Sequence, residues 1–428
     1  MTSRSSAAPP GGAAHPAARS AAPIATRLAS AGGFLLHRGW WLGVLLVFLA
    51  SRLVTTAIVL WFAAHQADNP WNTGAQPSYA DFARIWDGNW YWIVADSGYP
   101  SVLPRDDDGL VSENAWAFLP AFPFVVRTIM VLAGTGSFAV PAIVVSVLCA
   151  AGAALVLHRM LRPRLSAGTT MFAVLLFCVA PLSPILQLTY AEPMFLLLIG
   201  VALLLLQRRR YLTLLPFLVL ADLTRPGGLA FALALAIHVI VRFARRHVDP
   251  FERAQRWRAV AATVVAGLAG LAWPAIAAIV TGDPSAYTDT ELAWRSSYIG
   301  DVELLPFTPW VQGAIWWFRW VGWPAWLAVV LLALTVAAAG LALFTPPLRR
   351  LGTDVRAWLA SYALYLLAVF FPQSSTFRVL MPLFPALGAL AIPRSRVYRV
   401  LLVLACVVGQ AVWMKWCWWY DGWDWTPP

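Results

Sequence analysis

The 428-residue sequence contains few charged residues. Asp, Glu, Lys and Arg together make up only 12% of its positions, about half the fraction found in a typical soluble domain. Hydrophobic residues make up 60%, and the mean hydropathy is +0.68. These values exclude an ordinary soluble globular protein and indicate a chain that spends most of its length in a membrane.

The sequence also lacks the motifs of several common enzyme classes. The four cysteines show no C-x-x-C spacing, which excludes a disulfide framework or a zinc site of the usual kind. The six histidines are scattered, and there is no Walker A loop, no G-x-S-x-G and no H-E-x-x-H. No D-x-D pattern lies in a site-like context. We therefore expect neither a cofactor nor a divalent metal.

The basic residues are nearly all arginine. Lys415 is the only lysine among 31 basic residues, and the formal net charge is +11. A charge of this size can indicate nucleic-acid binding. Here the arginines cluster in the short segments between apolar runs, a pattern set by membrane topology, so nucleic acid is not predicted as a partner.

Apolar stretches close to the ~20 residues that cross a bilayer recur along the whole chain. They predict an all-α polytopic membrane protein with about 11 transmembrane helices. The expected crossings are 40–64, 138–158, 169–188, 193–207, 211–222, 226–241, 259–280, 323–344, 357–371, 379–393 and 398–415.

The arginine clusters predict the orientation of these crossings. With the N-terminus inside, the main basic clusters all fall on the inner side, at 4–38, 159–164, 208–210, 242–258, 349–356 and 394–399. A wrong number of crossings would have placed such clusters on both sides. We expect an integral protein of the plasma (cytoplasmic) membrane with a cytoplasmic N-terminus.

Three parts of the chain follow from this topology. Residues 1–39, rich in Ala, Pro, Ser and Gly, predict a disordered cytoplasmic tail. Residues 40–416 form the transmembrane domain, with outer loops at 65–137 and 281–322. Residues 417–428 form an outer aromatic tail. The second outer loop reads as a partly helical cap that covers a lipid or an acceptor.

Some segments allow more than one interpretation. The run 40–64 is too long for a cleavable signal peptide and lacks a small-residue cleavage site, so it reads as a retained helix. The prolines and Arg127 of segment 116–133 favour a helix in the outer interface over a further crossing. Segments 211–222 and 226–241 are short and read as a hairpin of broken helices, where a site can lie.

The first outer loop contains the most informative sequence, DFARIWDGNWYWIVADSGYP at residues 81–100. If it forms one helix from about Phe82 to Asp96, its aromatic residues recur near helical spacing and it lies on the membrane surface. Asp87 is then surrounded by Trp86, Gly88, Trp90, Tyr91 and Tyr99. A carboxylate beside aromatic faces suits a sugar and can act as a general base. An interfacial aromatic belt with an incidental Asp explains the spacing equally well.

Three further charged residues are predicted at the same outer face. Glu192 precedes Pro193 in the first turn of a helix, where the helix dipole alone explains an acid. Arg225 lies at the tip of the hairpin and Arg378 at another outer helix end. Outer arginines run against the positive-inside trend, which favours a phosphate-binding role over simple anchoring. Asp222 is the other candidate partner of Arg225, as a structural ion pair.

These residues resemble the motifs of PIG-V-type mannosyltransferases. WDGNWYWIVADSGYP resembles the first-loop signature of that family, and FLPAFPFVVR (118–127) the segment that follows it. TYAEPMF (189–195), LTRPGGL (223–229) and TFRVLMPLFP (376–385) resemble later segments in family order. The first motif is fairly specific, whereas the others are weak alone. The arginine bias and the Ala/Pro-rich N-terminus indicate an actinobacterial source.

The resemblance implies a type C glycosyltransferase (GT-C) fold, with a catalytic acid in the first outer loop. It also implies transfer of mannose, with inversion, from a polyprenyl-phosphate-mannose donor to a glycolipid or glycan acceptor. Asp87 would be the general base. Trp86, Gly88, Trp90, Tyr91, Tyr99, Glu192, Arg225 and Arg378 would bind substrate.

Two other functions compete with this one. A flippase or transporter for lipid-linked sugars would need polar residues along a path near mid-membrane, whereas the predicted polar cluster lies at one face. A non-catalytic subunit of a cell-envelope glycan complex is the third alternative.

Overall fold

The computed structural model describes residues 39–70 and 74–420 of the chain. Within these residues the secondary structure is helical, apart from one isolated β-bridge between Arg105 and Val111. The predicted all-α fold is therefore confirmed. The chain divides into two units, residues 1–43 and 44–428, and the helical residues from Val44 onward belong to the second. Residues 1–38 of the predicted tail 1–39 and residues 421–428 of the predicted tail 417–428 lie outside the described residues.

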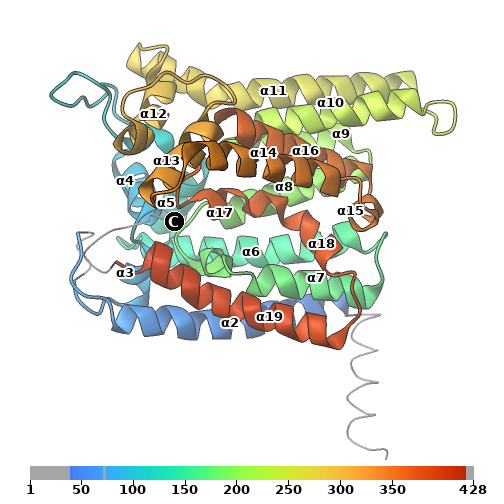
Figure 1. Ribbon diagram of the computed structural model, residues 1–428, viewed down its shortest axis with the longest axis horizontal. Helices are drawn as coiled ribbons and strands as arrows, with labels where there is room; N and C mark the ends of the chain where they lie inside the picture. The colour runs from blue at the N-terminus through green and yellow to red at the C-terminus, as the bar shows by residue number, and fades with distance from the viewer. Residues whose placement is uncertain (1–38, 71–73, 421–428) are drawn as a thin grey trace, which may run out of the picture. The chain divides into compact units, whose positions relative to one another are not determined.

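Each of the predicted crossings contains helical residues (Figure 1). The elements are α2 (Trp40–Ala64), α6 (Ala139–Leu161), α7 (Ala167–Val179) with η2 (Ser183–Gln187), α8 (Glu192–Gln207), α9 (Tyr211–Asp222), α10 (Gly228–Ala244), α11 (Arg253–Thr281), α14 (Ala325–Ala342), α16 (Thr353–Val369), α17 (Thr376–Val379) with η3 (Met381–Ala386) and α18 (Leu387–Leu390), and α19 (Arg396–Trp413) with η4 (Met414–Trp418).

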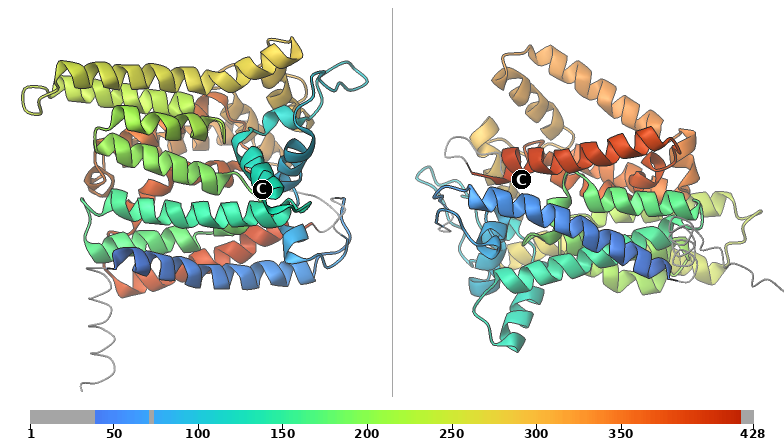
Figure 2. Two further views of the ribbon diagram at one scale, coloured as in Figure 1. Left: turned by 180° about the vertical axis from the view of Figure 1, so that it is seen from behind. Right: turned by 90° about the horizontal axis from the view of Figure 1, so that it is seen from below.

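Five of these helices are long and apolar enough to cross a membrane: α2, α6, α11, α14, and α19 with its extension η4. The others are shorter and pack inside the group, α8 against α6 and α9, and α10 against α11 and α16. Helix α14 lies at the edge, where Ala328 is its one buried residue (Figure 2, right). Such exposed apolar faces suit contact with lipid.

Shorter helices gather at one end of the long ones, which we call the loop end (Figure 1, left). They are α3 (Tyr79–Ala83), α4 (Asp87–Ser97), η1 (Ala115–Ala117), α5 (Ala121–Ala133), α12 (Ala286–Ile299) and α13 (Pro309–Trp320). The second loop is thus partly helical, as predicted.

The single helix expected from Phe82 to Asp96 is wrong. The structure breaks it at Trp86, whose φ of 62° lies in the left-handed region that a bulky residue rarely adopts. The turn buries the Trp86 side chain, and its indole N–H donates to the carbonyl oxygen of Trp418 at 2.9 Å. A tertiary contact therefore overrides the local helical pattern.

The arginine-rich connections lie at the other end, which we call the basic end (Figure 1, right). The Arg164 side chain packs against Gly352, and Arg209 forms an ion pair with Asp249 at 2.6 Å. Connections that are far apart in sequence therefore meet at one end, as the predicted topology requires.

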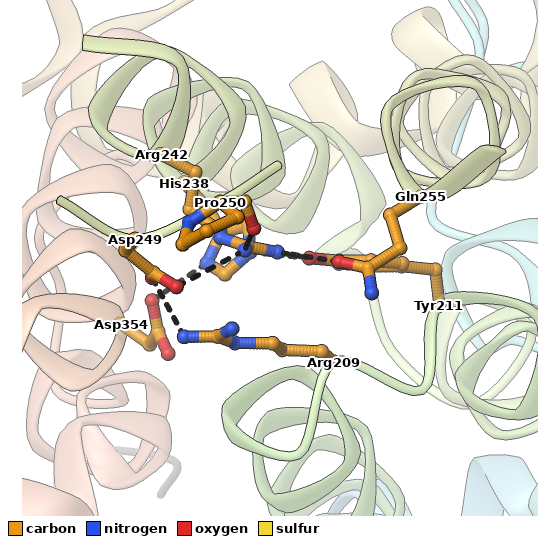
Figure 3. Close-up of polar contacts among 8 residues, drawn as sticks. All are labelled: Arg209, Tyr211, His238, Arg242, Asp249, Pro250, Gln255 and Asp354. Carbon is orange, nitrogen blue, oxygen red and sulfur yellow. Dashed lines mark hydrogen bonds and ion pairs between the residues drawn. The ribbon is translucent and has the colours of Figure 1, made fainter. Parts of the chain in front are cut away.

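A buried polar cluster fastens helices together at the basic end (Figure 3). His238 on α10 contacts the Asp354 carboxylate through Nδ1 at 2.7 Å and the Tyr211 hydroxyl through Nε2 at 3.0 Å. Arg242 donates to the same hydroxyl at 3.0 Å and lies 3.5 Å from an oxygen of Asp249. The cluster joins α9, α10, α16 and the α10–α11 connection, so we assign it a structural role.

Helix α2 contains a buried arginine that the sequence analysis did not single out. Arg52 donates to the carbonyl oxygens of Ser183 at 2.8 Å and Cys178 at 2.5 Å, and to Gln187 Oε1 at 3.0 Å. Cys178 lies in the last turn of α7, and Ser183 and Gln187 belong to η2, in the stretch between α7 and α8. Irregular backbone inside a membrane needs such internal partners, and this stretch leads directly into Glu192.

We predict that Arg52→Leu lowers the midpoint of thermal unfolding. Each buried acceptor left without a donor costs about 1–3 kcal/mol. The measurement is thermal denaturation of the purified protein, beside Arg127→Leu on the exposed side of α5 as the matched control. Equal midpoints for Arg52→Leu and wild type would contradict this role.

Candidate active site

The beginning of α4 is fixed against the segment that precedes α8. Asp87 is the first residue of α4, and its backbone N–H donates to the Tyr190 hydroxyl at 3.2 Å. A methyl group added at Gly88 would clash with Thr189 Oγ1, so only glycine allows this close approach. The Thr189 hydroxyl donates to the carbonyl oxygen of Ala83 at 2.9 Å. The first loop is therefore docked with the Asp87 carboxylate directed at the helix ends.

Glu192 begins α8, as predicted from the proline that follows it. Its side chain is 2% exposed, so the positive end of the helix dipole does not by itself account for a buried charge at this position. The residue requires specific partners, and the structure supplies two.

Two arginines converge on these two carboxylates. Arg378 Nη1 donates to Asp87 Oδ2 at 2.5 Å and to Glu192 Oε1 at 2.8 Å. Arg225 Nη1 lies 2.9 Å from the same Glu192 oxygen and 3.3 Å from the Tyr91 hydroxyl. We call Asp87, Glu192, Arg225 and Arg378 the charge network. It joins α4, α8, α17 and the α9–α10 connection.

The network holds two positive and two negative charges in a largely buried place. The side chains of Asp87 and Arg378 are 17% and 7% exposed. Burial raises the pKa of Asp87 above its ordinary value, and the guanidinium groups of Arg378 and Arg225 oppose that rise. A carboxyl of raised pKa is a stronger base once it is ionised.

Part of the hydrogen-bonding capacity of the network is unused. Glu192 Oε2 and Arg378 Nε are buried and have no partner. Buried polar atoms are nearly always paired in native proteins, so such atoms at one place call for an explanation. A ligand with polar groups at this place would pair with them.

Aromatic residues surround the network on the side of the first loop. Tyr91 is 1% exposed and lies edge-on to Phe118 and Phe122, with ring centroids 5.4 and 5.2 Å apart. Trp90 stacks on Phe118 at 5.4 Å and meets Trp294 of α12 edge-on at 5.5 Å. Helix α12 thus lies over α4.

The structure brings most of the predicted site residues together, but not all. The four members of the charge network converge, and Gly88 and Tyr91 lie beside them. Trp86 packs in the cluster with Trp418, and Tyr99 stacks on Trp116 at 4.7 Å, so both lie in packing clusters beside the network. Their predicted substrate contacts stay predictions.

The alternative ion pair between Asp222 and Arg225 is wrong. Both carboxylate oxygens of Asp222 are buried and have no partner, while Arg225 pairs with Glu192. The short separation in sequence suggested the local pair, but the side chains point to different neighbours.

Two residues near the site were missed by the sequence analysis. The fully buried Tyr190 supports Asp87, and its ring lies 5.1 Å from the Arg378 guanidinium. Its place two residues before Glu192 was the available signal. Glu291 of α12 lies close enough to interact electrostatically with Arg225 and Asp87. In the sequence, Glu291 lies one helical turn after Tyr287, and this spacing was the available signal for Glu291.

Among the described residues, no group of three or more His, Cys, Asp or Glu side chains has the arrangement of a metal site. The two carboxylates of the charge network instead form ion pairs with arginine side chains.

Comparison with known proteins gives limited similarity. No protein-family model and no curated protein matches the chain. The chain is similar to a solved structure of the oligosaccharyltransferase AglB from Archaeoglobus fulgidus in complex with an inhibitory peptide and a dolichol-phosphate. The identity is 12% and the TM-score 0.40, covering 87% of this chain and 55% of that one. An oligosaccharyltransferase structure from the same organism, tethered with an acceptor peptide, is 12% identical with a TM-score of 0.36, covering 88% and 54%.

This chain therefore spans about half the length of those oligosaccharyltransferase chains. Similarities of this size do not assign a function. The resemblance to PIG-V-type mannosyltransferases likewise stays a prediction, and the charge network is the feature from which a function can be inferred.

We predict that Glu192→Gln destabilises the protein, because Arg225 then loses its carboxylate partner and Arg378 keeps only Asp87. Breaking a buried ion pair by removing one partner costs about 3–5 kcal/mol. The measurement is the midpoint of thermal unfolding, with Glu303→Gln on the exposed α12–α13 connection as the control. Methyl phosphate should raise the unfolding midpoint of the Glu192→Gln variant part of the way back to the wild-type value, because it replaces the missing anion. The same midpoint in both variants would argue against the network.

Proposed function

We propose that this protein is a membrane-embedded glycosyltransferase. In this proposal it transfers mannose, with inversion, from a polyprenyl-phosphate-mannose donor to a lipid-linked or cell-envelope glycan acceptor. The observation that carries it is the buried pairing of Arg378 with both Asp87 and Glu192, next to Arg225. A carboxylate of raised pKa beside two arginines can serve both a hydroxyl nucleophile and a phosphate leaving group.

The arginines hold the phosphate of the donor. Guanidinium groups bind phosphate oxygens through paired hydrogen bonds, and Arg378 has a buried Nε without a partner to offer. The polyprenyl chain remains in the bilayer against the apolar helix faces. Because the network is neutral before binding, a phosphodiester adds one negative charge and competes with Asp87 for Arg378.

That competition prepares the base. When Arg378 turns to the phosphate, Asp87 loses its nearest positive charge and its affinity for a proton increases. Asp87 then takes the proton from the acceptor hydroxyl as that oxygen attacks the anomeric carbon. The bond from the anomeric carbon to the phosphate oxygen breaks, and the lipid phosphate leaves with its electron pair. Asp87 becomes neutral as the phosphate gains a charge, so the total charge of the site is conserved.

The site faces the extracytoplasmic side of the plasma membrane in this proposal. Asp87 begins α4, one of the helices of the loop end, and the arginine-rich connections lie at the basic end. Basic loops are retained in the cytoplasm during insertion, and this tendency supports an outer position for the loop end.

A lipid-linked sugar flippase is the second candidate function. It would need polar side chains spread along a path through the membrane. The polar cluster of the basic end is held by hydrogen bonds among its own side chains, whereas Asp87 of the charge network begins α4 at the loop end. This separation favours an enzyme with one site at the loop end.

We predict that Asp87→Asn lowers kcat by about 100- to 10,000-fold, the usual contribution of a positioned base. The measurement is transfer of radiolabelled mannose from polyprenyl-phosphate mannose to a lipid extract of the host, using purified protein. Asp96→Asn on the exposed end of α4 is the matched control and should transfer like wild type. If Asp87→Asn transfers mannose at the wild-type rate, Asp87 is not the base. If the wild-type protein binds the donor but transfers no mannose, a flippase or a non-catalytic subunit is favoured.

A pH profile gives an independent prediction. Burial raises the pKa of Asp87, so kcat/KM should fall on acidification at a pH above about 3.9, the ordinary aspartate value. Activity requires the ionised form, which is present above the pKa and is lost below it. Arg378→Gln removes the strongest opposing charge and should move this acidic limb to higher pH in the residual activity. If the acidic limb of kcat/KM lay at the same pH in wild type and in Arg378→Gln, the electrostatic coupling between Arg378 and Asp87 would be contradicted.

A further inference from the structure

Helix α12 is fixed over the first loop by one of its faces. Ala286 packs beside Trp116 and Trp273, and Thr290 accepts a hydrogen bond from Asn114 Nδ2 at 2.9 Å. Trp294 lies edge-on to Trp90 at 5.5 Å. These α12 residues are spaced by four, so they form one stripe that holds the helix in place.

The neighbouring stripe of α12 faces the site. It consists of Tyr287, Glu291 and Arg295, again spaced by four. Arg295 Nη2 lies 3.4 Å from the carbonyl oxygen of Val369, at the end of α16. The carboxylate of Glu291 interacts electrostatically with Tyr287, Arg225 and Asp87. The stripe thus lies between α16 and the charge network.

Several buried polar atoms in this region have no partner. They are the indole N–H of Trp294, both carboxylate oxygens of Asp222 and Oε2 of Glu192. Asp222 is 4% exposed, and Tyr365 of α16 interacts electrostatically with both Asp222 and Glu291. The open donor of Trp294 and the open acceptors of Asp222 and Glu192 are atoms that a ligand able to accept and donate hydrogen bonds would pair.

The charges restrict the chemical class of that ligand. Beside α12, the carboxylate of Glu291 would repel an anion, while the guanidinium of Arg295 would repel a cation. A neutral polyol avoids both penalties, because its hydroxyl groups donate to carboxylates and accept from N–H groups. Aromatic side chains such as Trp90 and Trp294 provide faces for the C–H surface of a sugar ring.

We propose that α12 forms the acceptor subsite, in which Trp294 and Glu291 bind the hydroxyl groups of an uncharged sugar ring and present one of them to Asp87. This inference rests on the proposed function and adds to it the residues and the chemical class of the acceptor. The indole N–H of Trp294 donates to one hydroxyl. A second hydroxyl donates to the Glu291 carboxylate.

The test measures binding of small sugars to the full-length protein in lipid nanodiscs by saturation-transfer NMR. The probes are methyl glycosides of mannose, glucose, galactose and N-acetylglucosamine, with methyl phosphate as the anionic probe. Trp294→Phe keeps the ring and removes the N–H, and Glu291→Gln keeps the shape and removes the charge. Asp289→Asn is the matched control on α12, because Asp289 accepts a hydrogen bond from the Ser285 hydroxyl at 2.5 Å.

We expect the tightest-binding glycoside to bind roughly 3- to 10-fold more weakly to Trp294→Phe and about 10-fold or more weakly to Glu291→Gln, from the usual strengths of neutral and charge-assisted hydrogen bonds. Asp289→Asn should bind the glycoside like wild type, and Asp289→Asn and Trp294→Phe should bind methyl phosphate like wild type. Glu291→Gln should bind methyl phosphate at least as tightly as wild type, because it removes a negative charge that interacts with Arg225.

Unchanged glycoside affinity in both site variants, or no saturable glycoside binding to wild type, would overturn the subsite. A different result would contradict the proposed function, namely equal affinity of wild type and Arg378→Gln for methyl phosphate. A variant that fails to fold is recognised by its loss of methyl phosphate binding, and the other α12 variant then decides the outcome.

Discussion

A single buried guanidinium, that of Arg378, organises the loop end of this protein. It donates to Asp87 at 2.5 Å and to Glu192 at 2.8 Å, and these three residues come from α17, the first loop and α8. A charge removed from water must be neutralised where it lies, so these segments can be buried together only as a set. Arg225 completes the balance by sharing the Glu192 oxygen.

The packing around the network serves this arrangement. Gly88 lets α4 approach Thr189, the Tyr190 hydroxyl accepts from the backbone of Asp87, and Trp86 is held by Trp418. The irregular segment before α8 is in turn bound by Arg52. The same balance makes the site responsive, because an anion that takes Arg378 leaves Asp87 without its counterion. In the proposed mechanism, binding of a phosphate and activation of a base are thereby one event.

Much of this could be predicted from the sequence, and the reasons for the exceptions are physical. Hydropathy located the helices, and arginines on the wrong side for the positive-inside rule identified Arg225 and Arg378. The break at Trp86 could not be predicted, because it depends on a contact with Trp418, 332 residues away. The alternative pair of Arg225 with Asp222 was wrong, because a residue nearby in sequence is visible as a candidate and the tertiary partner Glu192 is not.

The most direct test of the central claim is equilibrium binding of synthetic polyprenyl-phosphate mannose to the purified protein in lipid nanodiscs. We predict that Arg378→Gln and Arg225→Gln each weaken binding roughly 10-fold or more, as loss of a charge-assisted hydrogen bond does. Arg127→Gln, on the exposed side of α5, should bind like wild type. Wild-type affinity in both network variants would contradict the claim that these arginines hold the donor phosphate.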